Sequence, residues 1–175
     1  MQPDRDAFRA ACGASFDALP DIVRRAHTGT ARLAGRVAVQ RGSPFANLIA
    51  DALGLPQTGA SVDMMIESEH RADVMIWNRT IGGRPFRSCF RFVRDRLAES
   101  VGPFSLLLRH VVADGRLHYR LERVSAMGLP WPRALAPHLE AREGAANGQY
   151  AFAVEVRLPI LGRLVRYSGT LDIVS

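Results

Sequence analysis

The fold of this chain is decided by residues 62–92, which read VDMMIESEHRADVMIWNRTIGGRPFRSCFRF. Apolar and polar residues alternate through most of this stretch, which is the pattern of β-strands with one buried face. Gly82-Gly83 predicts a type I′ hairpin turn, because both central positions of that turn need a positive φ that glycine adopts without strain. The stretch is therefore expected to form three consecutive antiparallel strands.

The glycine turn also sets the register of the hairpin that it closes, because side chains alternate between faces along each strand. The expected pairs are Arg79 with Phe86, Trp77 with Ser88 and Met75 with Phe90. A preceding turn centred on Arg71 and Ala72 continues the same face. It would pair Ile66 with Trp77 and Met64 with Arg79. Both hairpins then agree on one largely apolar face, made by Val62, Met64, Ile66, Met75, Trp77, Ile81, Phe86 and Phe90.

Arg79 is the anomaly on this face, because a guanidinium that is buried without a partner loses its hydration. One interpretation is structural: Arg79 reaches water at the strand end or pairs with an internal carboxylate such as Glu99. A second is that the sheet curls around a cavity, in which Arg79 and Ser88 bind the polar end of an anionic ligand. A direct catalytic role is the third interpretation.

Helical segments and one strand are expected before this stretch. Residues 4–27 carry apolar positions three or four apart, which is typical of an amphipathic helix, and Pro20 divides the segment in two. Residues 32–41 alternate as a first strand. Ser43-Pro44 then opens a helix that ends at Gly54. The residues expected on its apolar face are Phe45, Leu48, Ile49, Ala52 and Leu53.

A second clear hairpin turn is predicted at Asp114-Gly115. Its register sets His110 opposite Tyr119 on a leucine-rich face. The structural interpretation is a hydrogen-bonded pair in the core, and the functional one is a pair of polar contacts in a cavity. The proline-rich residues 127–139 are expected to cross irregularly, and a last hairpin is expected over residues 150–171.

Together these elements predict an α+β fold that is mostly antiparallel β. We expect a curved meander sheet of about eight strands that forms a partial barrel, with the N-terminal helices packed against it. The chain is expected to be a single domain over residues 1–175, with a helical segment at 4–27 and the sheet from about 32 to 173. Strands that alternate along their length are typical of folds that enclose a cavity.

Composition narrows the function classes. The chain of 175 residues has a net charge of +6, and its 23 basic residues are all arginine. Arginines and phenylalanines are interleaved between residues 84 and 96. The register places the phenylalanines on the Trp77 face but Arg87 and Arg91 on the opposite face, which disfavours nucleic-acid binding. We find no long apolar run and no start typical of a signal peptide. A cytoplasmic protein without a membrane span is therefore expected.

The motifs of common enzyme classes do not occur. The glycine-rich nucleotide motifs, the nucleophile motif G-x-S-x-G and the zinc motif H-E-x-x-H are missing. The histidines lack metal-ligand spacing and the two cysteines are too few for a zinc site, so we expect no metal and no cofactor. Whether the protein is an enzyme stays open, with the balance against it. An acid–base site could still use Tyr119, His110 or Glu99 without a linear motif.

Seven short motifs occur in order: LPxxVRxxH (19–27), GxxxVxRG (35–42), GLPxxG (54–59), WxRxIGGRxFxS (77–88), ExxGP (99–103), GLPxP (128–132) and VRYSGTL (165–171). In these motifs the chain resembles a bacterial family of domains of unknown function, catalogued as forty-one sixty-six. Members of that family occur alone or C-terminal to NAD(P)-binding, dehydrogenase-like domains, and no activity is assigned to them. The resemblance implies a free-standing accessory or ligand-binding domain and supplies no catalytic residues.

We therefore expect a non-catalytic module that binds a hydrophobic or amphipathic anionic small molecule in the hollow of the sheet. The alternatives are an interaction domain for an oxidoreductase, with a dehydrogenase-like protein as partner, and a small cofactor-free lyase or isomerase. A large cavity in which Arg79 lacks an internal carboxylate would favour the module over the interaction domain. A desolvated His110 or Glu99 at that cavity would favour the enzyme. The candidate ligand-binding residues are Trp77, Arg79, Ser88, Phe86, Phe90, Met64, His110, Tyr119 and Glu99.

Overall fold

The computed structural model describes residues 7–71, 73–93 and 95–174. The predicted start of the helical segment at residue 4 and the predicted turn residue Ala72 lie outside these described residues. The helical elements are α1 (Ala7–Cys12), the 3₁₀ helix η1 (Gly13–Ala18), α2 (Asp21–Ala26), α3 (Pro44–Ala52) and the 3₁₀ helix η2 (Arg133–Leu135). The strands are β1 (Thr30–Arg41), β2 (Gly59–His70), β3 (Val74–Ile81), β4 (Arg84–Val93), β5 (Arg96–Val101), β6 (Phe104–Ala113), β7 (Arg116–Ala126), β8 (Leu129–Pro130), β9 (His138–Ala146), β10 (Gln149–Leu158) and β11 (Gly162–Val174).

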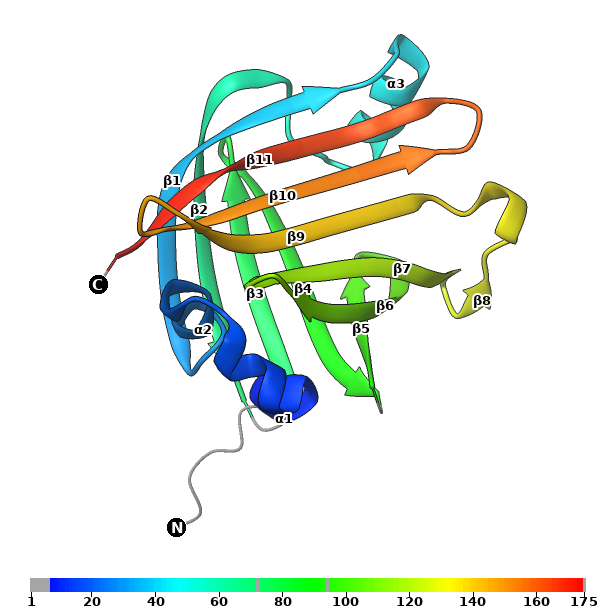
Figure 1. Cartoon of the computed structure of the whole chain (residues 1–175). Coiled ribbons are helices and arrows are strands. Elements are labelled where there is room, and N and C mark those ends of the chain that lie inside the picture. Colours follow the sequence, from blue (N-terminus) through cyan, green and yellow to red (C-terminus); the bar gives the residue numbers. More distant parts are fainter. Residues whose placement is uncertain (1–6, 72, 94, 175) are drawn as a thin grey trace.

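The strands that the structure describes form one antiparallel sheet, in the order β6-β5-β4-β3-β2-β1-β11-β10-β9-β7-β8. An additional pairing between β6 and β7 joins the two sides of this sheet and closes it into a barrel, with β8 as an extra strand on β7 (Figure 1). The pairing of β7 with β9 is short and covers Leu117–Arg120 of β7. Closure gives all inward side chains a common interior.

Mostly antiparallel β structure with N-terminal helices is confirmed, but two details of the predicted architecture are wrong. The described residues hold eleven strands where about eight were expected, and the barrel is closed rather than partial. The strands β8 and β9 account for part of the difference, since both lie in residues 129–146. Residues 127–139 were predicted to cross irregularly, and no strand was predicted between them and the last hairpin. Asn147-Gly148, both at positive φ, form the turn from β9 to β10 and are a hairpin signal that could have revealed β9.

The two hairpins with strong turn signals have the predicted register. The confirmed pairs are Arg79 with Phe86, Trp77 with Ser88 and Met75 with Phe90 between β3 and β4, and His110 with Tyr119 between β6 and β7. Both turns contain glycine at positive φ. A two-residue turn of this kind leaves one way to pair the flanking strands, which explains why local sequence sufficed.

The register predicted between β2 and β3 is wrong by two residues. Ile66 lies opposite Arg79, and Ser68 lies opposite Trp77. The last pair before the loop is His70 with Met75, so the loop is two residues longer than predicted. Because a shift of two preserves the facing of every side chain, the inward face stays as predicted.

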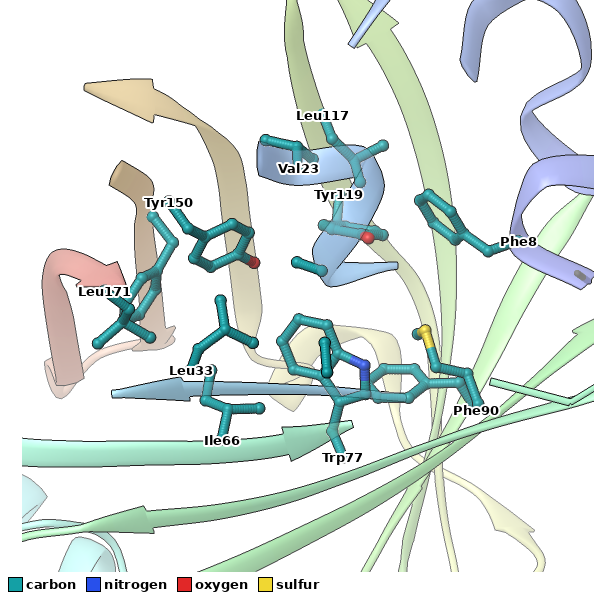
Figure 2. Close-up of a cluster of buried hydrophobic side chains, with 14 of the residues drawn as sticks. Phe8, Val23, Leu33, Ile66, Trp77, Phe90, Leu117, Tyr119, Tyr150 and Leu171 are labelled. Carbon is teal, nitrogen blue, oxygen red and sulfur yellow. The ribbon is translucent and has the colours of Figure 1, made fainter. Parts of the chain in front are cut away.

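The N-terminal helical elements cover one end of the barrel (Figure 1). Phe8 of α1, Phe16 of η1 and Val23 of α2 are buried there. Figure 2 shows Val23 lying beside Leu117 and Tyr119 of β7, and the Phe8 ring stacks on His27. The apolar faces of these short helices therefore form a plug that seals this end, which we call the closed end.

The other end of the barrel carries α3, β8 and η2 (Figure 1). Ser43 caps α3 as predicted, because its side chain accepts a hydrogen bond from the Ala46 backbone N–H. The expected apolar face is not the buried one: Ala46 and Ala50 are fully buried, whereas Phe45 and Leu48 are 73% and 70% exposed. The helix packs on the sheet through its smallest residues and leaves large apolar side chains outside.

Among the described residues, the structure contains no helix that is long and apolar enough to cross a membrane.

The close approach of β1 and β11 gives a prediction about Gly169. An added Cβ at this position would lie 2.5 Å from the Arg36 carbonyl oxygen and 2.8 Å from a Val37 methyl group. We expect Gly169→Ala to lower the free energy of unfolding by about 1–3 kcal/mol, measured by chemical denaturation, since the clash involves backbone. Ser168→Ala, one residue away, is the control and should change stability by less than about 0.5 kcal/mol. Equal stability of both variants would contradict this packing.

Candidate functional site

The barrel encloses a cavity of about 840 Å³. It reaches from His27 and Tyr150 at the closed end to Leu53, Trp131 and Leu135 at the other end, which we call the mouth. Most of its lining side chains are aliphatic or aromatic. This volume lies within the range of about 300–1,000 Å³ that is usual for small-molecule sites.

Arg79 lies on the cavity wall within a hydrogen-bonded chain of three residues. Its Nη1 donates to Ser88 Oγ at 2.9 Å, and Ser88 Oγ donates to Glu99 Oε1 at 2.6 Å. The Arg79 Nη1 and Glu99 Oε1 atoms are 3.9 Å apart, and each side chain is 11% exposed. Arg79 therefore has the internal carboxylate that the structural interpretation requires, and Ser88 links the two charges. Of the two conditions set for the ligand-binding module, the large cavity is met, but the lack of an internal carboxylate is not. We call Arg79, Ser88 and Glu99 the arginine cluster.

Aromatic rings surround the guanidinium of Arg79. Its central carbon lies 5.2 Å from the Trp77 ring centroid, 5.5 Å from that of Phe86 and 5.8 Å from that of Phe90. Cations are attracted to the faces of such rings, and the attraction grows when water is excluded. The rings hold Arg79 in place while its remaining N–H groups have no hydrogen-bond partner among the described residues.

The predicted site residues are mostly brought together. Those that line the cavity are Met64, Trp77, Arg79, Phe86, Phe90, Glu99 and Tyr119. Ser88 is fully buried behind Arg79 and binds both charged groups of the arginine cluster. His110 is not among the lining residues. It lies below the N-terminal plug, with its Nε2 3.4 Å from the Ala11 carbonyl oxygen.

A second polar cluster occupies the closed end of the cavity. The His27 Nε2–H donates to Glu143 Oε2 at 2.5 Å, although His27 is fully buried and Glu143 is 11% exposed. The imidazole stacks on Phe8 at 4.1 Å and lies 5.1 Å from the Trp77 ring. Tyr150 lies close enough to Glu143 for this carboxylate to raise the pKa of the tyrosine. We call His27, Glu143 and Tyr150 the histidine cluster.

Tyrosine hydroxyls near this cluster are held in the protonated form. Burial raises the pKa of Tyr119 and Tyr150 well above 10, and the negative charge of Glu143 raises both further. Burial also raises the pKa of Tyr167, although the positive charge of Arg79 opposes this shift. Figure 2 shows the Tyr150 hydroxyl pointing toward the interior of the buried cluster. These groups can donate hydrogen bonds at any physiological pH.

Among the described residues that line the cavity, two buried ring nitrogens have no hydrogen-bond partner. They are Trp77 Nε1 and His27 Nδ1, and both residues line the cavity. Buried polar groups are nearly always hydrogen-bonded, so an exception at a cavity indicates a place for a bound molecule. Trp77 lies between the two clusters, since its ring contacts both His27 and Arg79.

The sequence analysis missed the histidine cluster. His27 was predicted only as the end of the helical segment and of the motif LPxxVRxxH, and no strand was predicted around Glu143. The alternation of side chains along β9 could have revealed it. Leu139, Ala141 and Glu143 occupy alternate positions, so they point to the same side of the strand, and all three line the cavity. A charged residue on the inward side of a strand is the same anomaly that identified Arg79.

In the described part of the chain, no group of three or more His, Cys, Asp or Glu residues is arranged to hold a metal ion. The cavity instead offers hydrogen-bond donors and two carboxylates in apolar surroundings. Such an arrangement can bind a polar group of a mainly apolar molecule, or hold and move a proton.

The contact between Arg79 and Glu99 predicts that the losses of stability in their single variants do not add in the double variant. We expect Arg79→Met and Glu99→Leu each to lower stability by about 3 kcal/mol, because each leaves a buried charge without its partner. The double variant should lose much less than the sum of the two, as measured by urea denaturation. Additivity within about 0.5 kcal/mol would show that the two charges do not interact.

His70 predicts a loss of stability in acid. Burial is the main cause that lowers its pKa from 6.5 to about 3, the nearby His27 adds to this, and a hydrogen bond with the Ala26 backbone opposes it. Because the folded protein disfavours the charged form, the contribution is complete above about pH 6.5 and is lost as pH falls toward 3.

Between about pH 7 and pH 4.5, the wild type should lose about 2 kcal/mol through His70. His70→Gln, which cannot titrate, should lose that much less over the same range in denaturation experiments. Parallel pH profiles for the two proteins would refute the prediction.

Comparison with known proteins adds one finding to this geometry. The sequence model of a family described as a domain of unknown function (DUF4166) matches residues 19–171, which run from just before α2 into β11 and include both polar clusters. The resemblance stated from the motifs is thereby confirmed. No curated protein matches the chain.

Proposed function

Since the chain belongs to the DUF4166 family, whose description assigns no function, we propose a function from the cavity: the protein is a non-catalytic module that binds an amphipathic small molecule inside its barrel. The observation that carries this proposal is the cavity of about 840 Å³ with a mainly apolar wall and unpaired polar nitrogens. An interior built only for stability would be filled by side chains, because natural cores are close-packed.

The contacts of Arg79 define the chemistry of the ligand's polar end. Its free N–H groups and the Trp77 Nε1–H are donors, so the ligand must present acceptors. Glu99 already balances the charge of Arg79 at 3.9 Å, which removes the need for a full negative charge on the ligand. A carbonyl or hydroxyl oxygen therefore fits as well as the anionic group expected from the sequence, and the two are separated by experiment below.

The apolar body of the ligand would contact the cavity wall between the arginine cluster and the mouth. Phe86, Phe90 and Met64 belong to this wall, together with aliphatic residues of β6, β7 and β10. Each buried methylene group contributes about 0.8 kcal/mol to such binding. We further propose that the protein is cytoplasmic and that a dehydrogenase-like protein is its partner.

A small cofactor-free lyase or isomerase is the second candidate. It is favoured by the desolvated Glu99, which is 8% exposed at the cavity, and by the buried pair of His27 and Glu143. Carboxylates and imidazoles in apolar surroundings are the groups that enzymes use for proton transfer. The same experiment separates this candidate from a binding module, because a catalyst converts the molecule that it binds.

The test is to identify what the purified protein carries. Native and denatured mass spectrometry should reveal a stoichiometric compound in the wild type, lost or strongly reduced in Arg79→Ala. The control is Arg91→Ala, which removes an exposed arginine from the neighbouring strand β4 and should keep the compound. An empty wild type would favour the interaction domain instead.

Two dyes provide a second readout on ligand-free protein. Anilinonaphthalene sulfonate is anionic and Nile red is neutral, and both should fluoresce on entering an apolar cavity. If the ligand is anionic, Arg79→Ala should weaken binding of the first dye selectively. If the ligand is neutral, Arg79→Ala should weaken the binding of both dyes alike.

A third experiment tests the enzyme candidate. The natural compound is incubated with fresh protein, and its recovery in a chemically changed form would establish that the protein is an enzyme.

A further inference from the structure

The mouth of the barrel exposes an unusual amount of apolar surface. Eight large hydrophobic side chains are exposed on the segments that surround it: Phe45, Leu48, Leu53, Met127, Leu129, Trp131, Leu135 and Ile160. Figure 1 shows that these segments, α3, the β7–β9 connection and the β10–β11 turn, all lie on the side opposite α1 and α2. We call these residues the rim. Exposed apolar side chains gathered around a cavity opening mark an interaction site.

Two of the exposed rim residues have an unfavourable backbone conformation, which indicates that their exposure serves a function. Ile160 is 96% exposed at φ 70° and Met127 is 82% exposed at φ 50°. Left-handed backbone is unfavourable for side chains such as these, and above all for a β-branched residue, whereas Gly or Asn adopts it readily. At both positions the chain therefore accepts a conformational cost to present an apolar side chain to the outside.

The charge around the rim identifies the partner. Residues 43–58, 82–88, 101–105, 123–137 and 157–163 contain six arginines and one acidic residue, Asp51. Asp51 is already paired with Arg41 at 2.7 Å. Arg157 and Arg163 are paired with Glu155, which lies just outside these ranges. Arg87, Arg123 and Arg133 are exposed and have no acidic partner among the described residues. The mouth thus presents apolar side chains within a ring of positive charge.

We propose that the rim docks on the surface of an anionic lipid bilayer, with the cavity mouth facing the membrane. Apolar side chains surrounded by arginines match the two layers of such a surface, since the former enter the acyl boundary and the latter bind anionic headgroups. Trp131, whose Nε1 donates to the Leu135 carbonyl, has the amphipathic ring that is enriched at this depth. Docking in this orientation would let the cavity exchange an amphipathic ligand directly with the bilayer.

This inference extends the proposed function, but its test does not depend on a ligand. Ligand-free protein is sedimented with vesicles of phosphatidylcholine alone or mixed with phosphatidylglycerol. We expect partitioning into the anionic vesicles, weakening as salt is raised, and little partitioning into the neutral ones. If the protein does not bind vesicles, the docking proposal fails but the proposal of a ligand in the cavity is unaffected. If Arg79→Ala loses the ligand but still binds vesicles, the two proposals are shown to be independent.

The decisive variant is Met127→Asn/Ile160→Asn. Asparagine tolerates a positive φ, so thermal unfolding should occur at an equal or higher temperature, while vesicle partitioning should fall at least about tenfold through loss of two apolar contacts. Arg133→Gln should weaken partitioning about fivefold. The matched controls are Val93→Asn and Arg91→Gln, which change exposed residues near the closed end and should leave partitioning unchanged.

Three results would overturn the proposal. The first is the absence of binding to anionic vesicles at low salt, and the second is an equal loss of binding in the rim and control variants. The third is a concentration-dependent dimer in sedimentation velocity that the rim variants dissociate, because the rim would then be a contact between two copies of this chain.

Discussion

Closure of the sheet by the β6–β7 pairing is the constraint on which the rest of the structure depends. Alternation along a strand decides which side chains share a face, but only a closed sheet makes all those faces meet. Because β7 pairs with β6 on one side and β9 on the other, residues from distant parts of the sequence line one space. His27, Arg79 and Glu143 are examples, and each is a polar residue in a mainly apolar interior.

Burying the two polar clusters costs folding free energy, which an interior of apolar side chains would not. Replacing buried charged groups by apolar residues of similar size is often neutral or stabilising, so a buried ion pair is weak evidence for a role in stability. Here the charges occur beside open space rather than within a filled core, and Trp77 joins the two clusters through its ring. Local departures from optimal stability of this kind are characteristic of functional sites.

The parts of the fold that sequence could predict are those fixed by local chemistry. Gly82-Gly83 and Asp114-Gly115 set their hairpins correctly, because a tight turn determines the pairing beside it. The loop after His70 has no such signal within it, and its predicted register was wrong by two residues. Closure depends on contacts between distant segments, and no pattern within a single strand encodes them.

The candidate site was predicted to the same extent. The alternation of side chains along the strands placed Trp77, Arg79 and Ser88 on the inward face. Glu99 was named as a carboxylate with which Arg79 could pair, and the structure contains this pair, linked by Ser88. His110 was misplaced as a cavity contact, because the sequence could not tell which part of an inward face the N-terminal helices would cover. The outward face of α3 also escaped prediction, since an apolar stripe on a helix shows what can be buried and not what is buried.

The short seam between β7 and β9 has a consequence for what the barrel can hold. Ladder pairing with β9 covers Leu117–Arg120, and the end of β7 bonds to β8 instead. Leu121, Val124 and Leu139, on the two sides of this unzipped portion, all line the cavity. Beyond Arg120 the two strands are therefore joined by side chains rather than by ladder hydrogen bonds. This part of the wall can separate at a lower cost in free energy than a fully paired seam, so local opening of the barrel is expected to begin here.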